Sequence, residues 1–232
     1  MLTRDQAYKL TEKILALSKL PECTVGIRDS EQAFIRFANN GVTTSGFTNE
    51  RTVTVASTRD GKTGVTEVTE FDDASLERAV RTSEELAEIS PANPERLDPL
   101  PPQKYADKEN WDDATARARS PEMVPHVKAI IDRALAKKLV AAGFFTRTAS
   151  IDVSSNKKKN FLYERATDSR LTTTVRTPQG TSSGWAGQPA VRIAEINGAA
   201  LGARAIDKCQ RWTGKPMRPE PGKYTVVLEP TA

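Results

Sequence analysis

The sequence contains a single histidine, His126, and only two cysteines, Cys23 and Cys209, among 232 residues. Catalysis by a Ser-His-Asp or Cys-His arrangement would have to use His126, and a histidine-rich zinc site is excluded within this chain. The surrounding segment SPEMVPHVKAIIDRAL predicts the start of a helix, so we interpret His126 as a partly exposed helix residue. The two cysteines stand near opposite ends of the chain, and we expect two reduced, mostly buried thiols.

Aromatic residues make up only 6% of the chain, so the core must be built mainly from Val, Ile, Leu and Ala. The N-terminus, MLTRDQAYKL, lacks the apolar segment of a signal peptide. No apolar run approaches the ~18–20 residues that a membrane-spanning helix needs. The net charge of +4 argues only weakly for an anionic partner. These features predict a cytoplasmic protein that does not bind a membrane.

Several motifs that would identify an enzyme are missing. The segment DGKTG, residues 60–64, lacks the spacing of a phosphate-binding loop and predicts a hairpin turn instead. Ser182-Ser183-Gly184 does not have the Gly-x-Ser-x-Gly pattern of a nucleophile elbow. The carboxylate pair Asp72-Asp73 suits a helix cap, and Asp112-Asp113 suits a loop. The residues alone therefore indicate no catalytic centre.

Helices are predicted where apolar residues recur at helical spacing between capping and terminating residues. Thr3 and Gln6 have the spacing of a capping box. Gly198 and Gly202, four residues apart, indicate close packing of the last helix against a sheet. The predicted helices are Thr3–Leu20; a helix that Asp72 or Asp73 caps and that runs through Ile89; a helix with Ser120 as N-cap and Pro121 at its first position, which Gly143 stops; and Gln188–Thr213.

Strands are predicted where β-branched and aromatic residues alternate with polar ones between turn residues. Asp60-Gly61 is the strongest turn signal, because a type I′ turn needs positive φ at both central positions. Further turns are expected at Asp29–Glu31, Asn39–Gly41 and Pro178–Gly180. The predicted strands are residues 23–30 and 32–40, two arms around Asp60-Gly61, residues 143–155, 159–169 and 170–186, and Tyr224–Leu228.

Because strands come in runs and helices are segregated from them, the order of elements predicts an α+β fold with antiparallel or mixed β-sheets and helices packed on one face. We expect a first α+β half at residues 1–90, a proline-rich linker or arm at 91–119, a second α+β half at 120–223, and the start of a missing C-terminal domain at 224–232. Trp111 is expected to anchor the linker to the body of the protein. The two halves are loosely alike, but no sequence repeat is strong enough to indicate duplication.

Two stretches favour nucleic-acid binding as an alternative function. Lys157–Lys159 precedes Phe161 and Tyr163, which lie on one face of a predicted strand and suit base stacking. The segment Arg204–Lys223 is also rich in basic residues. A solvated hairpin tip, core packing of the two aromatic rings and a helix end with an exposed loop account for the same residues. We favour these structural interpretations, and nucleic acid is not the expected partner.

The stretch FIRFANNGVTTSGFTNERTVTVASTRDGKTGVTEVT resembles the N-terminal signature of the TldD/PmbA family, also called modulators of DNA gyrase or U62-type peptidases. In that family an Arg-x-x-x-Asn-Gly element precedes a Gly-containing spacer and an Asp-Gly hairpin. IDVSSNKKKNFLYERATDSRLTTTVRTPQGTSSGWAG resembles the family's central strands, although Ser155-Asn156-Lys157 stands where the family usually has an Asn-Ser-Gly turn. PGKYTVVLEPTA resembles the end of the N-terminal domain. The signature positions in this chain are Arg36, Asn40, Gly41, Gly46, Asp60, Gly61 and Gly64.

The resemblance implies the N-terminal domain of a zinc-dependent peptidase assembly that acts on peptides. The family's zinc-binding His-Glu-x-x-x-His helix belongs to a C-terminal domain, so the resemblance implies no catalytic residue, metal or cofactor in this chain. LEPTA is more similar to the non-catalytic PmbA/TldE branch, which implies a TldD/TldE-like partner subunit or a homodimer. Arg36 and Asn40 are the candidate substrate-binding residues. The remaining alternative is a free-standing adaptor.

Overall fold

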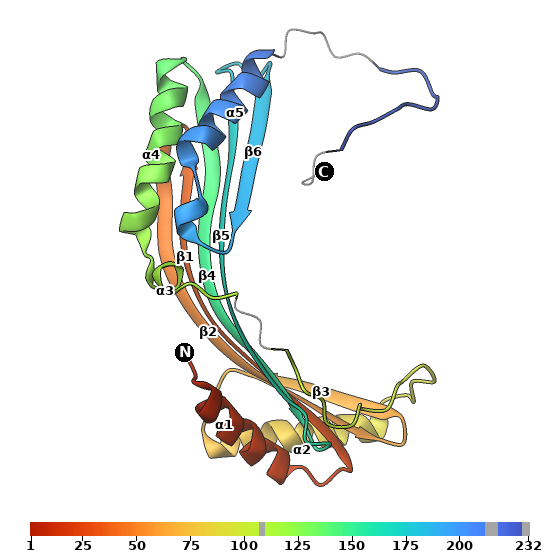
Figure 1. The fold of residues 1–232 in the computed structure, drawn as a ribbon. Coiled ribbons are helices and arrows are strands. Elements are labelled where there is room, and N and C mark those ends of the chain that lie inside the picture. The colour runs from red at the N-terminus through yellow and green to blue at the C-terminus, as the bar shows by residue number, and fades with distance from the viewer. Residues whose placement is uncertain (107–109, 212–217, 229–232) are drawn as a thin grey trace. The chain divides into compact units, whose positions relative to one another are not determined.

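The computed structural model describes residues 1–106, 110–211 and 218–228. It contains one six-stranded sheet with the strand order β3-β2-β1-β4-β5-β6 (Figure 1). The α+β fold class, with antiparallel strand pairs and helices, is confirmed. The elements are α1 (Arg4–Leu17), β1 (Glu22–Ala38), β2 (Gly41–Arg59), β3 (Lys62–Val68), α2 (Asp73–Ile89), α3 (Asp113–Arg117), α4 (Ser120–Ala136), β4 (Val140–Asn156), β5 (Phe161–Arg176), β6 (Ser183–Ala190), the 3₁₀ turn η1 (Ile193–Glu195) and α5 (Gly198–Arg211).

The order of elements repeats: α1-β1-β2-β3-α2 is followed, after the connector, by α4-β4-β5-β6-α5. The first strands of the two series, β1 and β4, are neighbours in the sheet. Their pairing is antiparallel, because Lys157 N–H donates to the Cys23 carbonyl at one end and Asn40 N–H donates to the Ala141 carbonyl at the other. The likeness of the two halves is therefore topological, although the sequence shows no clear repeat.

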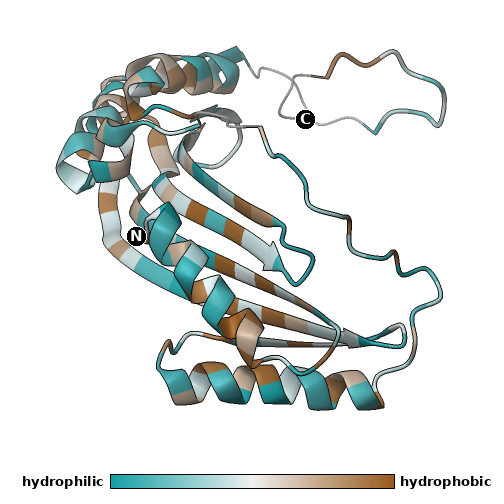
Figure 2. Cartoon of the chain, turned by 60° about the horizontal axis from the view of Figure 1, so that its bottom comes forward, coloured by the Kyte–Doolittle hydropathy of each residue, from teal (hydrophilic) through white to brown (hydrophobic). Residues whose placement is uncertain are grey.

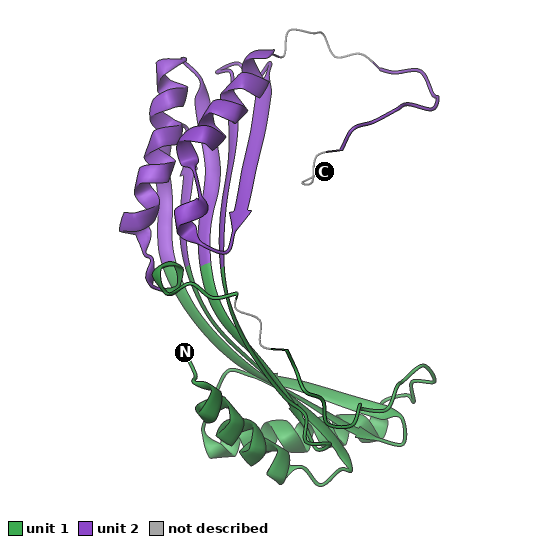
Figure 3. Ribbon diagram, viewed as in Figure 1, with its two compact units in different colours: residues 1–32, 47–116, 148–167 green, residues 33–46, 117–147, 168–232 purple. Residues whose placement is uncertain are grey.

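Contacts divide the chain into two compact units, each assembled from three stretches (Figure 3). Unit 1 comprises residues 1–32, 47–116 and 148–167, and unit 2 comprises residues 33–46, 117–147 and 168–232. In unit 1, α1 packs with α2 and α2 packs on β3; in unit 2, α4 packs with α5 and α5 packs on β6.

Each unit has its own hydrophobic core. Apolar and polar residues alternate along the strands, as Figure 2 shows, so one set of side chains on each strand is available for burial. Val25 and Leu76 are buried in the core of unit 1. Phe37, Phe145 and Leu171 are buried in the core of unit 2.

The predicted caps of the first two helices and three of the four predicted tight turns are confirmed. Thr3 and Gln6 form the capping box of α1, and Asp72 caps α2 by accepting from Ser75 N–H. The β1–β2 connection has positive φ at Asn39 and Asn40, as the two central residues of a primed turn require. The other predicted turns also contain residues in the left-handed region: Asp60 (φ 52°), Gly61 (φ 75°) and Gly180 (φ 72°).

The prediction of a turn at Asp29–Glu31 is wrong, because β1 runs without interruption through these residues. Asp29 is fully buried within the strand, and its carboxylate accepts from Leu2 N–H and from the Arg51 guanidinium, both at 2.8 Å. Both bonds go to Oδ2, whereas the buried Oδ1 has no hydrogen-bond partner among the described residues. The Arg51 guanidinium compensates a charge that would otherwise favour an exposed turn. The break expected between residues 169 and 170 is also absent, because β5 is continuous through them. From Ser169 onward β5 pairs with β6, a partner distant in the sequence.

The prediction of a helix over Gln188–Thr213 is wrong in its first third. Gln188 and Pro189 belong to the end of β6, where they pair with Leu171 and Arg170. The helix α5 begins only after Asn197, whose side chain accepts from Ala200 N–H at 2.9 Å. Its predicted last residues, 212–213, lie outside the described residues.

The two glycines of α5 pack against a helix rather than the sheet. A Cβ at Gly198 would lie 2.7 Å from His126 Cα, and one at Gly202 would lie 3.2 Å from Ile130 Cα. Both neighbours belong to α4. The close approach that the spacing of the glycines predicts therefore exists, but it joins α5 to α4.

The ends of α4 also differ from the prediction. Ser120 is the first helical residue, and Arg119 precedes it as N-cap, with Arg119 N–H donating to the Glu122 carboxylate at 2.8 Å. The helix ends at Ala136, and Lys138 adopts a left-handed conformation (φ 55°). Gly143 does not end the helix but lies within β4, where a Cβ would come 2.5 Å from the Phe37 ring.

The predicted strand Tyr224–Leu228 has no regular structure. Its apolar side chains are exposed, with Val227 at 93% and Leu228 at 72%. The alternation predicts a strand only where another strand supplies the ladder, and no described strand pairs with these residues. Residues 229–232 lie outside the described part of the chain. No helix among the described residues is both long enough and apolar enough to cross a membrane.

Candidate functional site

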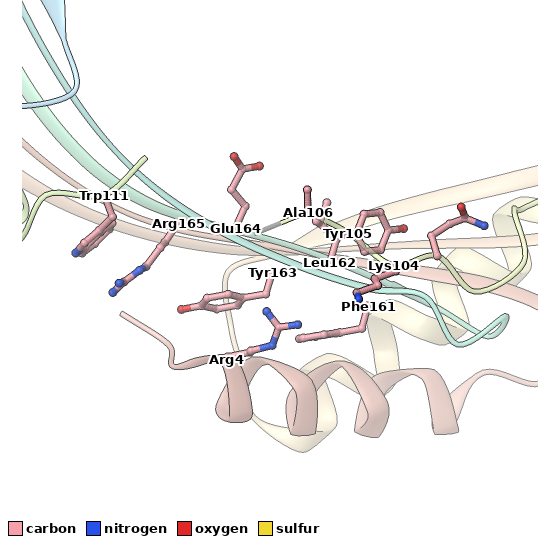
Figure 4. Close-up of a pocket in the computed structure, with 11 residues that line it drawn as sticks. Arg4, Lys104, Tyr105, Ala106, Trp111, Phe161, Leu162, Tyr163, Glu164 and Arg165 are labelled. Atoms are coloured by element: carbon pink, nitrogen blue, oxygen red, sulfur yellow. The ribbon is translucent and has the colours of Figure 1, made fainter. Parts of the chain in front are cut away.

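A cavity with a volume of about 1170 Å³ lies in unit 1. Residues from the start of β5, from the proline-rich connector and from the first turn of α1 line this cavity (Figure 4). We call this cavity the β5 groove. Its lining residues are Arg4, Gln103, Lys104, Tyr105, Ala106, Trp111, Phe161, Leu162, Tyr163, Glu164 and Arg165.

One wall of the β5 groove consists of aromatic rings under a cation. Phe161 and Tyr163 are two residues apart on β5, and their side chains therefore lie on the same face of the strand. The Arg4 guanidinium lies 5.5 Å from the centre of the Phe161 ring and 5.9 Å from that of Tyr163. Tyr8 meets the Phe161 ring edge-on. The two rings are thus held by α1 and also pack against the core of unit 1.

The hydroxyl of Tyr163 is used inside the protein. It donates to the Leu2 carbonyl at 3.1 Å, and burial raises the pKa of the Tyr163 hydroxyl above its ordinary value. The group therefore stays protonated and serves as a tether for the N-terminal residues. It is not suited to act as a base.

A second pairing of an arginine with an aromatic ring closes the far end of the groove. The Arg165 guanidinium lies 4.9 Å from the Trp111 ring centre, and Trp111 Nε1 donates to the Asp113 carboxylate at 2.8 Å. Trp111 thus attaches the connector to β5, as the sequence predicts. Cation–π contacts of this kind are worth about 0.5–2 kcal/mol.

The connector is held at two points. At one end the Asn160 amide donates to the Leu100 carbonyl at 2.8 Å, and its oxygen accepts from Gln103 N–H at 2.7 Å. At the other end Thr167 N–H donates to the Asn110 carbonyl at 2.8 Å. Between these two points no hydrogen bond joins residues 103–106 to the backbone of residues 161–165. Residues 103–106 therefore do not form a strand against β5.

The same stretch of β5 has no strand partner on its outer edge among residues 1–106, 110–211 and 218–228. Pairing with β6 involves only Ser169–Arg176, and the sole described bridge before that joins Asn110 and Ala166. Along Phe161–Arg165 no described residue pairs with the edge that faces away from β4. The β5 groove thus brings aromatic and charged side chains of β5, α1 and the connector to one cavity.

The described side chains that line the groove include several charges. Three are cations, Arg4, Lys104 and Arg165, and Glu164 is the carboxylate among them. In Figure 4 Glu164 points away from the face that carries Phe161, Tyr163 and Arg4. The pairs that the structure gives join none of the three cations to a described carboxylate.

The described residues do not provide a metal centre, since nowhere among them do three or more His, Cys, Asp or Glu side chains gather. His126 lies on α4 in unit 2, beside a smaller hollow of about 380 Å³. Burial lowers its pKa, and the Phe145 ring meets it edge-on. Cys23 and Cys209 are both buried and free, as the sequence predicts, and burial raises the pKa of the Cys23 thiol.

The structure places both candidate substrate-binding residues at the β1–β2 hairpin of unit 2. Asn40 is in the turn, where its side chain donates to the Leu139 carbonyl at 2.9 Å and accepts from Ala141 N–H at 2.7 Å. Arg36 has an exposed side chain on β1, and its carbonyl accepts from the Thr43 hydroxyl. Neither residue lines the β5 groove, and substrate binding by either stays a prediction.

The basic stretches that suggested nucleic-acid binding are largely engaged within the protein. Lys157 Nζ donates to the carbonyls of Ser18 and Leu20, just beyond the end of α1, and Lys159 pairs with Glu12. In Arg204–Lys223, Arg211 pairs with Asp207, and residues 212–217 lie outside the described part. The two stretches belong to different units.

Sequence reasoning identified Phe161, Tyr163 and Trp111 but missed the three cations of the groove. Arg4 lies in a helix whose capping box attracts attention to Thr3 and Gln6, and Lys104 lies in a segment without regular structure. The proline-rich connector is the one signal that the sequence offers for the groove. Prolines cannot complete a ladder of backbone hydrogen bonds, so the proline-containing part of the connector is not expected to pair with a strand as a regular strand would.

Comparisons with known proteins place this geometry in context. Residues 23–87 match the family model described as PmbA/TldA metallopeptidase domain 1. A search of curated proteins gives no match. Three solved structures share the fold, and the chain spans about half the length of each.

Two of these structures are described as candidate modulators of DNA gyrase. The one from Thermotoga maritima MSB8 has a TM-score of 0.79 and 14% identity, over 91% of this chain and 50% of that chain. The one from Bacteroides thetaiotaomicron VPI-5482 has a TM-score of 0.81 and 14% identity, over 93% and 52%. TldE from Thermococcus kodakarensis has a TM-score of 0.76 and 12% identity, over 88% and 47%. At such identities the likeness establishes the fold.

Proposed function

We propose that this chain, which belongs to the TldD/PmbA family by the match of residues 23–87 and by its fold, is the N-terminal domain of a peptidase assembly. It shapes the path of the peptide and the interface between subunits, and it carries no catalytic centre. The observation that supports this role best is the family match in a chain that spans about half of each similar structure.

Zinc is the metal that the family implies, and the residues described here do not fit it. His126 is the only histidine of the chain, and no group of metal-binding side chains surrounds it. We therefore assign no step of peptide hydrolysis to this chain. Zinc would be held by a C-terminal domain with the His-Glu-x-x-x-His motif, in the same polypeptide or in a partner subunit.

Within the family we favour the non-catalytic PmbA/TldE-like branch, in which this chain pairs with a TldD-like subunit. The likeness of the fold to TldE supports a subunit role of this kind, and a homodimer is the alternative. The resemblance to the family implies that the peptide substrate is a short or unfolded chain.

Co-purification tests the proposal. The chain is tagged and co-expressed with a TldD-type subunit that carries the histidine motif, and the purified material is assayed for zinc and for cleavage of a fluorogenic peptide. We expect retention of the partner, one zinc-dependent activity in the complex, and no cleavage by the tagged chain alone. Stoichiometric zinc and peptide cleavage by the chain alone would refute the proposal, as would failure to retain the partner together with a monomeric state.

A further inference from the structure

We infer that the open face of unit 2 binds single-stranded nucleic acid, with bases stacked on its aromatic rings and phosphates paired with its arginines. The open face is the side of the unit 2 strands that faces away from α4 and α5. This inference goes beyond the proposed function, because it involves neither a peptide, nor a metal centre, nor a second subunit. The residues that carry it are Phe34, Arg36, Phe144, Arg170, Arg176 and Trp185.

The strands of unit 2 have one covered face and one open face. Phe145 and Ala186 are buried in the core together with residues of α4 and α5, which lie on one side of these strands (Figure 1). Successive side chains of a strand point to opposite faces, so Phe144 and Trp185 point away from the helices. Phe144 is 40% exposed and Trp185 is 38% exposed. The described helices therefore leave these aromatic side chains uncovered.

The aromatic rings form a row across the strands. The ring centres of Phe34 on β1 and Phe144 on β4 are 5.8 Å apart. On β5, the next strand, the Thr172 hydroxyl donates to the Phe144 carbonyl at 3.4 Å, and Thr172 is the register partner of Gly187 on β6. The indole of Trp185 lies beside Gly187, because a Cβ at this glycine would be 2.7 Å from Trp185 Cη2. The row therefore runs from β1 to β6, over ~14 Å at the usual spacing between strands.

A glycine at each end of the row leaves room for a ring. A Cβ at Gly46 on β2 would be 2.6 Å from Phe34 Cζ, so the Phe34 ring lies over Gly46 as the Trp185 ring lies beside Gly187. Each of these rings therefore rests against the sheet, and its exposed part is turned to solvent. Cross-strand aromatic contacts also stabilise a sheet by themselves. The class of ligand therefore follows from the charges and from the residues between the rings.

Three arginines border the row. Arg36 is two residues from Phe34 on β1, so both side chains are on the open face. On β5, Arg170 stands two residues before Thr172 and Arg176 stands four residues after it, so they flank the row on the same face. All three arginines are exposed, and the ion pairs among the described residues involve none of them.

One carboxylate belongs to the same part of the sheet. Asp168 is the only acidic residue among the strand residues of unit 2, and it lies two residues before Arg170. Burial raises the pKa of Asp168, and the nearby Arg170 opposes this effect. The open face thus has three arginines against one aspartate. Its charge favours an anionic ligand, and phosphate groups are the anions that arginine can pair with through two parallel hydrogen bonds.

The residues between the rings favour nucleic acid over a protein partner. The core of a protein interface is apolar, whereas Thr172 separates the rings, and Thr146 and Thr174 are on the same face. A second copy of the chain would bring arginine against arginine. A single strand of nucleic acid offers flat bases to the rings and phosphates to the arginines. The open face contains no residue of the basic stretches Lys157–Lys159 and Arg204–Lys223.

Fluorescence anisotropy with the purified chain tests the inference directly. The probe is a fluorescein-labelled oligothymidylate of about eight nucleotides, which exceeds the two or three bases that a sheet platform usually stacks. An oligouridylate of equal length distinguishes RNA from DNA as the preferred single strand. Two further probes separate stacking from charge: an abasic strand with the same number of phosphates, and a duplex in which the bases are already stacked and paired.

We expect saturable binding of at least one of the two single strands. Binding of the abasic strand and of the duplex should be at least about tenfold weaker, because one base stacked on an aromatic ring accounts for about a factor of ten. The affinity should also fall as salt rises. Two or three phosphate contacts to a single strand predict a slope of about −1.4 to −2.1 for log K against log salt concentration.

Variants locate the ligand on the open face. Trp185→Leu keeps an apolar side chain but removes stacking, so binding should weaken at least about fivefold, and Trp185→Phe should restore most of it. Phe144→Leu repeats the test at another ring. Tyr224→Leu, at an exposed aromatic residue outside the sheet, is the control. Arg36→Gln should reduce the salt slope by about 0.7, whereas Arg133→Gln, at an exposed arginine of α4, should not. Thermal melting verifies that each variant folds.

Each contrary result overturns the inference. Absence of saturable binding of both single strands by the folded chain would refute it. Equal binding of the abasic strand or of the duplex would exclude stacking on the rings. Effects of Trp185→Leu and Phe144→Leu no larger than that of Tyr224→Leu would place the ligand elsewhere. None of these measurements involves a metal, a peptide or a partner subunit, so their outcome is independent of the test of the proposed function.

Discussion

Gly64 of β3 and Gly184 of β6 occupy equivalent positions in the two halves of the chain. At each glycine a Cβ would collide with a carbonyl oxygen of the helix packed on that strand, Ser83 of α2 or Ala205 of α5. The next helical turn is equally close, with Leu86 Cβ and Lys208 Cβ both at 2.7 Å. The two halves thus use the same means to bring a helix against the last strand of each three-strand series.

This relationship predicts that a methyl group at either glycine separates helix from strand. Gly64→Ala and Gly184→Ala should each lower the free energy of unfolding by ~1–3 kcal/mol, the usual cost of overpacking. Gly41→Ala is the matched control, because a Cβ there meets only the Ala38 carbonyl at 3.9 Å. Urea denaturation followed by circular dichroism measures all three. Unchanged stability in both alanine variants would show that the helices move aside without cost.

Variants of Asn40 and Arg36, the two candidate substrate-binding residues at the β1–β2 hairpin, should differ in their effect on stability. Asn40→Ala removes two hydrogen bonds and places alanine at a φ of 60°, so we expect a loss of ~1–3 kcal/mol. Asn40→Gly removes the same two hydrogen bonds but tolerates the positive φ. Its stability should therefore lie between that of the native chain and that of Asn40→Ala. Arg36→Ala, at an exposed side chain, should change stability by less than ~0.5 kcal/mol. Melting curves of the three variants check this order, and a large effect of Arg36→Ala would contradict it.

Asn160 is predicted to control the position of the connector. Asn160→Ala removes the acceptor of Gln103 N–H and the donor to the Leu100 carbonyl, so residues 103–106 lose one of their two attachments. Trypsin should then cut after Lys104 several times faster than in the native chain, because proteolysis requires a locally opened segment. Gln103→Ala retains the backbone N–H and serves as the control. Mass spectrometry follows the cleavage after Lys104. Equal cleavage rates in the native chain and in Asn160→Ala would exclude this role of Asn160.

The ionisation of Glu84 is expected to cause part of the loss of folding stability at acid pH. Burial alone would raise its pKa, but Lys19 N–H and the Arg81 guanidinium outweigh burial and lower it below the ordinary value of 4.5. A carboxyl whose pKa is lower in the folded protein stabilises the fold above its unfolded pKa. That contribution disappears as the pH falls through the folded value.

Glu84→Gln should therefore destabilise the protein at pH 7 by ~1–3 kcal/mol and flatten the loss of stability below about pH 4.5. Glu85→Gln, at the next position of α2, is the control. Urea titrations at a series of pH values provide the measurement. An acid limb as steep in Glu84→Gln as in the native chain would assign the effect to other carboxyl groups.

Local signals in the sequence were sufficient for the caps of α1 and α2 and for the Asp60-Gly61 turn. Thr3, Asp72 and Asp60-Gly61 act within a few residues of themselves, and each has the predicted role. The middle of β1 was mispredicted because Asp29 finds its partners at Leu2 and Arg51, which no local window contains.

The end of β6 and the β5 groove were missed for the same reason. The end of β6 contains Gln188 and Pro189 and becomes a strand through pairing with β5. Strand identity at such positions depends on cross-strand neighbours more than on intrinsic preference. The groove joins residues from α1, the connector and β5, so only the folded chain shows that three cations meet there.

The interleaving of the two units sets a condition on synthesis. Unit 1 begins with residues 1–32 but needs residues 148–167 to complete it, and unit 2 likewise starts at residue 33 and continues through residue 168 and beyond. A ribosome must therefore release more than two-thirds of this chain before either core can close. During that interval β1 and β2 emerge without their later neighbours, so the nascent polypeptide depends on rapid completion or on a chaperone to stay unaggregated.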